Sequence, residues 1–270
     1  MRGASRAAFG RARDRLAAAV SDPATAATVG EELFAVAGLL DREPGLRRAL
    51  TDATSAQGAR TGLVRGLLGG RVSRATLDLV AGMATDRWAV PRDLADAAEE
   101  LAVLATAAAA ESADQLDNVE DELFRFSRII RGEPELHAAL SSARLPADRK
   151  SGVLDALLAG KVTRQSLRLI TQAAVHPRGR SLEAALSEYA RLAAAWRQRL
   201  IALVRVASEL TAGQRDRLAA WLAATYGHGI QLNIVLDPQV VGGMSIQIGD
   251  EFIDGSVANR LAVLRRRLTA

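Results

Sequence analysis

The spacing of apolar and polar residues predicts helices along the first two hundred residues. Leu33, Val36, Ala37 and Leu40 recur at intervals of three and four, which places them on one helical face. Proline, glycine and serine or threonine residues punctuate this pattern, as at the ends of short helices. The expected helices are an amphipathic one with Phe9, Leu16 and Val20 on one face, then 31–41, one opened by Pro44, 58–68, one capped by Ser73, 93–110, 117–130 and 182–199.

The helical region repeats itself at an offset of ninety residues. Glu32-Leu33-Phe34 returns as Glu122-Leu123-Phe124, and Glu43-Pro44 returns as Glu133-Pro134. Helical periodicity alone would reproduce leucines, but it would not reproduce a proline, a glycine and an arginine in register. The sequence therefore predicts a tandem duplication, with Gly70 and Arg74 also matched by Gly160 and Arg164.

After residue 200 the period changes from helical to alternating. Residues 201–206, 230–236, 244–248 and 252–253 read as strands. The second of these is predicted to be half-buried, with Leu232, Ile234 and Leu236 on its buried side. Thr211 and Gln214 form a capping box that opens a helix, with Leu218, Trp221, Leu222 and Tyr226 expected on one side. The predicted fold is mostly α, with a tandemly duplicated helical bundle region and a small α/β module. Its expected divisions are a first helical copy at 1–108, a second at 109–199 and the module at 200–270.

Composition narrows the possible classes of function. The absence of cysteine excludes disulfides and thiolate metal sites, and no apolar run reaches the roughly 18 residues that a membrane span requires. The net charge of +4 and the pI near 10.2 would suit a nucleic-acid partner. Acidic and basic residues are interleaved along the helices, however, which is typical of a solvated surface.

No constellation for catalysis is apparent. His137, His176 and His228 lie far apart without ligand spacing and read as surface or loop residues. Gly66, Gly69 and Gly70 follow a helix rather than a strand, so helix termination explains them better than a phosphate loop does. We expect no catalytic residues, no metal and no cofactor, and we expect Trp88, Trp196 and Trp221 to pack in cores.

The most specific local pattern lies in the last third of the chain. It resembles the C-terminal signature of the delta subunit of F-type ATP synthases, the oligomycin-sensitivity-conferring protein family, in the long form with a duplicated helical region found in high-GC Gram-positive bacteria. The residues that carry this resemblance are Gly242, Gly243, Asp250, Asp254, Gly255, Ser256, Arg260 and Leu261. From their chemistry we expect the glycines to shape a turn and Asp254 or Ser256 to cap a last helix.

The resemblance implies a mechanical role rather than an enzymatic one. In the family, a six-helix domain binds the N-terminal segments of alpha subunits on the alpha/beta catalytic head, and the C-terminal module binds the b subunit of the peripheral stalk. The implied location is the cytoplasmic face of the bacterial plasma membrane, reached only through the complex, with no nucleic acid bound. The candidate face for a partner helix is Leu261, Leu264 and Leu268. The alternative is a helical-repeat scaffold that binds nucleic acid or a regulatory protein.

Overall fold

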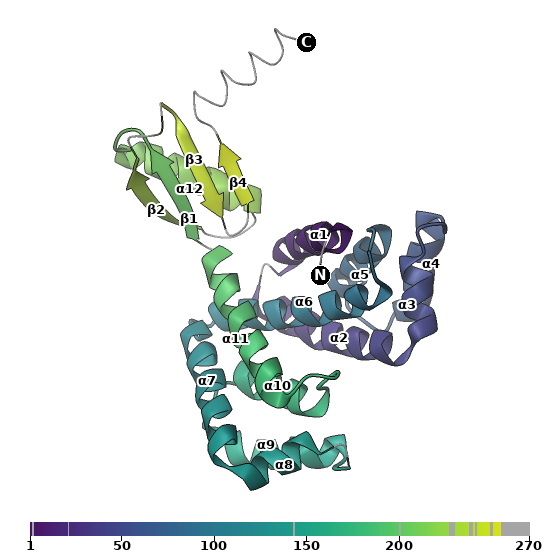
Figure 1. Ribbon diagram of the computed structural model, residues 1–270. Helices are drawn as coiled ribbons and strands as arrows, with labels where there is room; N and C mark the ends of the chain where they lie inside the picture. The colour runs from purple at the N-terminus through teal and green to yellow at the C-terminus, as the bar shows by residue number, and fades with distance from the viewer. Residues whose placement is uncertain are drawn as a thin grey trace. The chain divides into compact units, whose positions relative to one another are not determined.

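A computed structural model describes residues 1–254, apart from residues 2, 21, 143, 200, 227–229, 238, 239, 241, 249 and 250. The chain forms two compact units, Met1–Ala194 and Ala195–Ala270. The first is helical and the second holds a small mixed sheet with one helix, so the predicted fold class is confirmed (Figure 1). None of the helices in the described part has the length and apolar content that a bilayer crossing requires.

The first unit is built from helices, and the predicted helix at 31–41 begins earlier than expected, at Pro23, because Asp22 caps the helix there. Pro23, Pro44, Pro91 and Pro134 each stand at the first position of a helix, where the missing N–H costs nothing. The helices are α1 Ala4–Ala19, α2 Pro23–Arg42, α3 Pro44–Thr51, α4 Gln57–Leu68, α5 Arg74–Thr85, α6 Pro91–Glu111, α7 Leu116–Gly132, α8 Pro134–Ser141, α9 Ala147–Leu158, α10 Arg164–Val175 and α11 Leu182–Arg199.

The two copies share half-buried polar contacts at equivalent positions. The Glu32 carboxylate accepts hydrogen bonds from the backbone N–H of Ser73 at 2.7 Å and from its hydroxyl at 2.6 Å. Ninety residues later, Glu122 accepts the same two bonds from Thr163, at 2.9 and 2.8 Å. Each pair joins the long helix of a copy, α2 or α7, to the residue that caps α5 or α10. These matched contacts support the predicted duplication.

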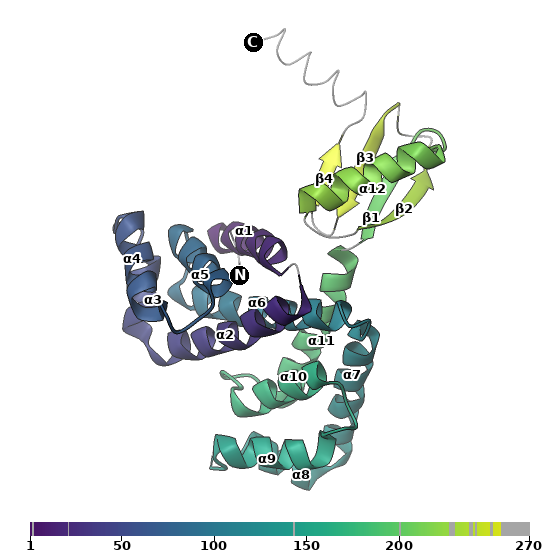
Figure 2. The same ribbon diagram turned by 180° about the vertical axis from the view of Figure 1, so that it is seen from behind.

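Helix α6 belongs to both copies. It closes the first copy by packing along α2, and it also packs against α7 and α10 of the second. In the repeat, α6 is the counterpart of α1. The buried residues Ala95, Ala98 and Ala102 of α6 correspond, at an offset of ninety, to Ser5, Ala8 and Ala12 on the buried face of α1. Side chains as small as alanine allow several helices to approach one helix closely. The two copies therefore form one continuous helical unit (Figures 1 and 2).

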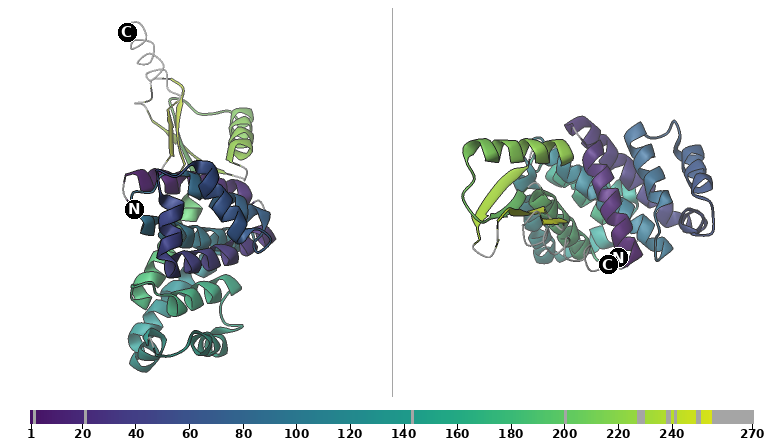
Figure 3. Two further views of the ribbon diagram at one scale, coloured as in Figure 1. Left: turned by 90° about the vertical axis from the view of Figure 1, so that its right-hand side faces the viewer. Right: turned by 90° about the horizontal axis from the view of Figure 1, so that it is seen from above.

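The second unit is a four-stranded sheet of order β2-β1-β3-β4. Strands β1 and β2 are parallel because helix α12 crosses over between them, whereas β1–β3 and β3–β4 are antiparallel. Helix α12 covers one face of the sheet, where Leu222 packs against Val204 and Ile246 (Figure 3). The bounds are β1 Ile201–Val206, α12 Ala212–Tyr226, β2 Gln231–Leu236, β3 Met244–Ile248 and β4 Glu251–Asp254.

Three expectations about side chains need correction. The buried face of α1 is Ser5, Ala8, Ala12 and Leu16, so Phe9 is only partly buried and Val20 stands at the C-cap. Trp88 and Trp196 are buried, but the side chain of Trp221 lies on the outer face of α12 with 49% of its surface exposed. Leu236, expected on the buried side of its strand, is 52% exposed because it ends β2 at the edge of the sheet.

Candidate functional site: the seam between the helical copies

The signature residues fall partly within the described structure. Gly242 and Gly243 have φ values of 71° and 81°, in the left-handed region that favours glycine, and lead directly into β3. Asp254 ends β4 and is exposed. The others lie outside the described residues: Asp250, Gly255, Ser256, Arg260, Leu261, and the partner-helix positions Leu264 and Leu268.

A cluster of charged side chains lies at the seam between the copies, where α2 and α6 meet the loop between α10 and α11. Arg178, in the loop between α10 and α11, has a side chain that is only 5% exposed. Its Nη1 donates to Glu99 Oε2 at 2.7 Å, and its Nη2 donates to Asp96 Oδ1 at 2.7 Å; both acids lie on α6. Its Nε lies 3.3 Å from Asp41 Oδ1 at the end of α2. One arginine of the second copy is thus held by three carboxylates of the first.

Glu99 is the centre of this cluster and is held by three donors. Its side chain is 3% exposed, and besides Arg178 it accepts from Arg180 Nη2 at 2.5 Å and from the Tyr189 hydroxyl at 2.6 Å. A buried carboxylate is tolerated when its lone pairs are satisfied and a cation lies beside it. The cluster therefore ties α6 to both the loop and α11.

The pKa values of two residues of the cluster, and of Glu100 beside it, are shifted. Burial opposes the charge on Arg178, but the nearby Glu99 and Asp96 outweigh it and raise the pKa of the guanidinium. Burial and the Glu99 carboxylate both raise the pKa of the Tyr189 hydroxyl, which remains a donor at neutral pH. Burial, with a smaller contribution from the charge of Glu188, raises the pKa of Glu100 to about 7.

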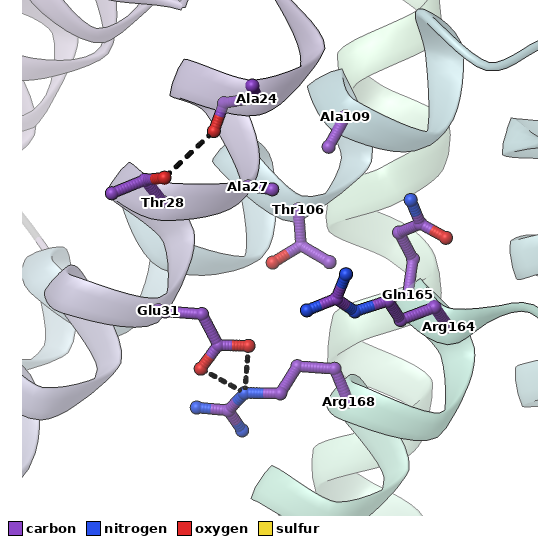
Figure 4. A pocket seen from close by; sticks show the side chains of 9 residues that line it. All are labelled: Ala24, Ala27, Thr28, Glu31, Thr106, Ala109, Arg164, Gln165 and Arg168. Atoms are coloured by element: carbon purple, nitrogen blue, oxygen red, sulfur yellow. Dashed lines mark hydrogen bonds and ion pairs between the residues drawn. The ribbon is translucent and has the colours of Figure 1, made fainter.

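A second contact crosses the seam from α10 to α2. Arg168 donates from Nε to the Glu31 carboxylate, at 2.7 and 2.6 Å, and its Cζ lies 4.5 Å from the centre of the Phe34 ring. Beside this pair is a cavity of about 330 Å³ lined by α2, α6 and α10 (Figure 4). Ala27 and Thr106 form part of its wall, and Arg164 reaches into it from α10 (Figure 4). Arg168 therefore joins the copies at a second point.

The seam joins the two copies through ion pairs and helix packing. No group of three or more potential metal ligands occurs among the described residues. His137 Nε2, on α8, lies 2.8 Å from Glu183 Oε1, at the start of α11. The pKa of His176 is lowered by burial and by the positive charge of Arg168. His228 is outside the described residues.

Sequence reasoning missed the residues of the seam. The sequence pattern predicts that Glu99 and Glu100 lie on an exposed helical face, where acids are normally solvated, and for Glu99 this interpretation is wrong because the residue is 2% exposed. Arg178 and Arg180 are predicted only as part of a loop, because buried ion pairs leave no periodic pattern. One signal was present, since the second copy shortens by two residues at the Pro177–Ser181 loop, where the register of the repeat is broken.

Comparison with known families gives a match over most of the chain. The model of the family described as "ATP synthase delta (OSCP) subunit" matches residues 101–268. This match begins inside α6 and includes α7 to α11, so it spans six helices of the described structure before the module. The helix shared by the two copies is therefore the first helix of the matched region.

Three curated relatives are similar along nearly the whole chain. "ATP synthase subunit delta" of Thermobifida fusca is 46% identical over 91% of each chain. The proteins of the same name from Streptomyces avermitilis and Streptomyces coelicolor are each 46% identical, over 99% and 100% of this chain and 98% and 99% of theirs. A chain in a cryo-EM structure of the Toxoplasma gondii mitochondrial ATP synthase hexamer aligns with 62% of this chain and 97% of its own. That alignment has 18% identity and a TM-score of 0.30, and a likeness this weak carries no argument.

Proposed function

Because the chain belongs to the ATP synthase delta (OSCP) subunit family, we propose that it is a non-catalytic stator subunit. In this role it links the N-terminal segments of the alpha subunits on the catalytic head to the b subunit of the peripheral stalk. The head then resists the torque of the rotor during proton-driven ATP synthesis. The complex holds the chain at the cytoplasmic face of the plasma membrane.

The observation that carries the proposal is the family match over residues 101–268, which includes six helices and the C-terminal module. The two compact units fit a protein that binds two partners, because each unit offers its own surface. Linking two contacts in one chain makes the second binding event intramolecular and multiplies modest affinities.

The seam supports a load-transmitting role for the helical unit. A stator link transmits torque without yielding only if its parts do not slide past one another. Shared helix α6 and the cluster around Arg178 join the copies through packing and charge at once. We assign the helical unit to the head and the module, with Leu261, Leu264 and Leu268, to the stalk.

Affinity purification of the tagged full-length chain from solubilised membranes tests the proposal. We expect alpha, beta and a b-type subunit to co-purify. A chain that ends at residue 199 should keep alpha and beta and lose the b subunit, with circular dichroism showing that its helices persist. Recovery of nucleic acid, or of no synthase subunit, would overturn the stator assignment.

The signature glycines have a structural role in this proposal. Gly243 has a φ of 81°, and a β-branched side chain at such a position is strained by roughly 1–3 kcal/mol. We expect Gly243→Val to destabilise the module by that amount and to weaken binding of the b subunit. The measurements are thermal unfolding and the same purification. If folding and stalk binding both survive intact, the turn does not depend on glycine.

A further inference from the structure

Helix α4 lies at the outer edge of the first helical copy and leaves most of its surface uncovered. It packs mainly against α5 and α3 (Figures 1 and 2). Its buried residues are Arg60 and Val64. Leu63 and Leu67, four positions apart, are 38% and 36% exposed. Residues at this spacing are neighbours on a helix surface, so among the described residues α4 presents an uncovered apolar pair.

Glycines form the side of α4 that lies opposite its buried residues. Gly58, Gly62 and Gly66 follow one another at spacings of four, with the two leucines on one flank and Arg65 on the other. A Cβ added at any of the three glycines would meet no atom within 4 Å. Since glycine is a poor helix former, packing within the chain gives no reason for it here. The outer face of α4, defined by these glycines, the two leucines and Arg65, is open to close approach by another helix.

The surroundings of this face are basic and contain no acid in the local sequence. Residues 53–77 include four arginines and neither Asp nor Glu. Two of the four are engaged, because Arg60 is buried in the fold and Arg74 pairs with an acid one turn along α5 at 3.5 Å. Arg65 and Arg71 are exposed, and neither side chain has a partner among the described residues. The outer face of α4 therefore combines apolar surface with uncompensated positive charge.

The second copy keeps the apolar pair of this face and reverses its charge. On α9, the counterparts of the two leucines are Val153 and Leu157, which are 38% and 41% exposed. The counterpart of Arg65 is Asp155. The same helix surface thus occurs in both copies with opposite charge on its flank, so the two faces suit partners of different charge.

Other occupants fit the outer face of α4 less well. A second copy of this chain could offer Asp155 on α9, but the exposed Arg149 and Lys161 stand near the two ends of that helix and would repel the arginines of α4. Pairing of α4 with α9 would also be head-to-tail and would extend without closing. A membrane surface is entered by bulky apolar side chains, which glycines lack. Nucleic acid would engage the arginines but leave the leucines exposed.

We propose that the outer face of α4 docks an acidic amphipathic helix of another subunit. The apolar residues of that helix pack on Leu63 and Leu67, its backbone approaches the glycines, and its carboxylates pair with Arg65 and Arg71. The face precedes residue 101, where the match to the family model begins. The first copy therefore has a contact of its own. This inference rests on the proposed function, since it places the partner within the assembled synthase.

Site-specific photo-cross-linking in the whole complex tests the inference. A photoreactive amino acid replaces Leu63 in the tagged full-length chain, the complex is purified and irradiated, and the adduct is mapped by mass spectrometry. We expect an adduct on a helix-forming segment of another subunit in which acidic residues outnumber basic ones. The matched control carries the same probe at Val153 and should not give that adduct. No adduct from position 63, or an adduct on lipid, nucleic acid, a second copy of this chain or a segment without the acidic excess, would contradict the inference.

Two substitutions separate docking from folding. Gly62→Leu places a good helix former where the structure has open space, so the melting temperature should not fall. Its re-binding to synthase stripped of this chain should nevertheless weaken by at least about tenfold. Arg65→Asp should weaken re-binding by a similar factor, whereas Asp155→Arg, the reverse change in the other copy, should not. Unchanged re-binding of either the Gly62 or the Arg65 variant, with folding confirmed by circular dichroism, would show that α4 does not dock the partner.

Failure of this inference is distinguishable from failure of the proposed function. If alpha, beta and b subunits co-purify with the full chain while position 63 gives no adduct, the stator role stands and only the assignment of the α4 face is wrong. If no synthase subunit co-purifies, both fail together.

Discussion

The guanidinium of Arg178 pairs with Glu99, whose side chain is only 3% exposed, and with the partly exposed Asp96 and Asp41. Without it, Glu99 keeps Arg180 and Tyr189 but loses its most buried cation. We expect Arg178→Ala to lower the free energy of unfolding by about 3–5 kcal/mol, measured by urea titration of the full chain. Arg191→Ala is the matched control, because its pair with Glu188 is 62% and 33% exposed and should contribute less than about 1 kcal/mol. Similar losses in the two variants would show that the buried cluster does not hold the seam.

Glu100, beside that cluster, makes stability depend on pH. Burial first, and Glu188 second, raise its pKa from 4.5 to about 7, so the folded state binds the proton more tightly than the unfolded state. Stability from this group is therefore full below about pH 4.5 and declines as pH rises to about 7. The N-terminal amine and Arg191 oppose the shift and Asp96 adds to it.

A Glu100→Gln variant isolates this effect. It removes the titration, so we expect it to match the wild type near pH 4.5 and to exceed its stability by at most about 3 kcal/mol at pH 8. Thermal unfolding across that pH range provides the measurement. A difference that is constant with pH would mean that Glu100 titrates normally, and Glu188→Gln should narrow the difference if the like charge contributes.

At the scale of the element, one carboxylate in each copy links the long helix, α2 or α7, to the N-cap of a second helix, α5 or α10. Glu32 and Glu122 each receive a backbone N–H and a hydroxyl from the capping residue of α5 or α10. Glu32→Ala and Glu122→Ala should each cost about 1–3 kcal/mol, because a half-buried N–H then loses its partner. Chemical unfolding of both variants is the measurement. If only one of the two variants loses stability, the carboxylate contact contributes to stability in that copy alone.

Elements were predictable from sequence where a local signal fixes them. The helix start at Pro44, the Ser73 cap and the Thr211–Gln214 capping box form as expected, since each depends on residues a few positions apart. The buried face of α1 was not predictable, because a neighbouring helix selects alanines over the larger Phe9. The ion cluster at Glu99 was equally hidden, since its members lie about eighty residues apart.

At the scale of the whole molecule, the sharing of α6 decides where the chain can be divided. A division after residue 108 follows the repeat but cuts through α6, Pro91–Glu111, three residues before its end. Leu101, Leu104 and the alanines from 105 to 110 are buried in the intact protein, and α7 and α10 pack against this helix. A chain that begins at 109 lacks that support, whereas a chain that begins at 90 keeps it.

We therefore expect residues 90–270 to fold and residues 109–270 to lose most of their helical structure. The first fragment uncovers the side of α6 that packs along α2, so it should be less stable than the full chain, but α6 still packs against α7 and α10. The second exposes the apolar residues of α7 and α10 that α6 covers, which favours unfolding or aggregation. Circular dichroism and hydrogen exchange of both fragments provide the measurement. Equal folding of the two would mean that α6 serves the first copy alone and that the second copy is an independent bundle.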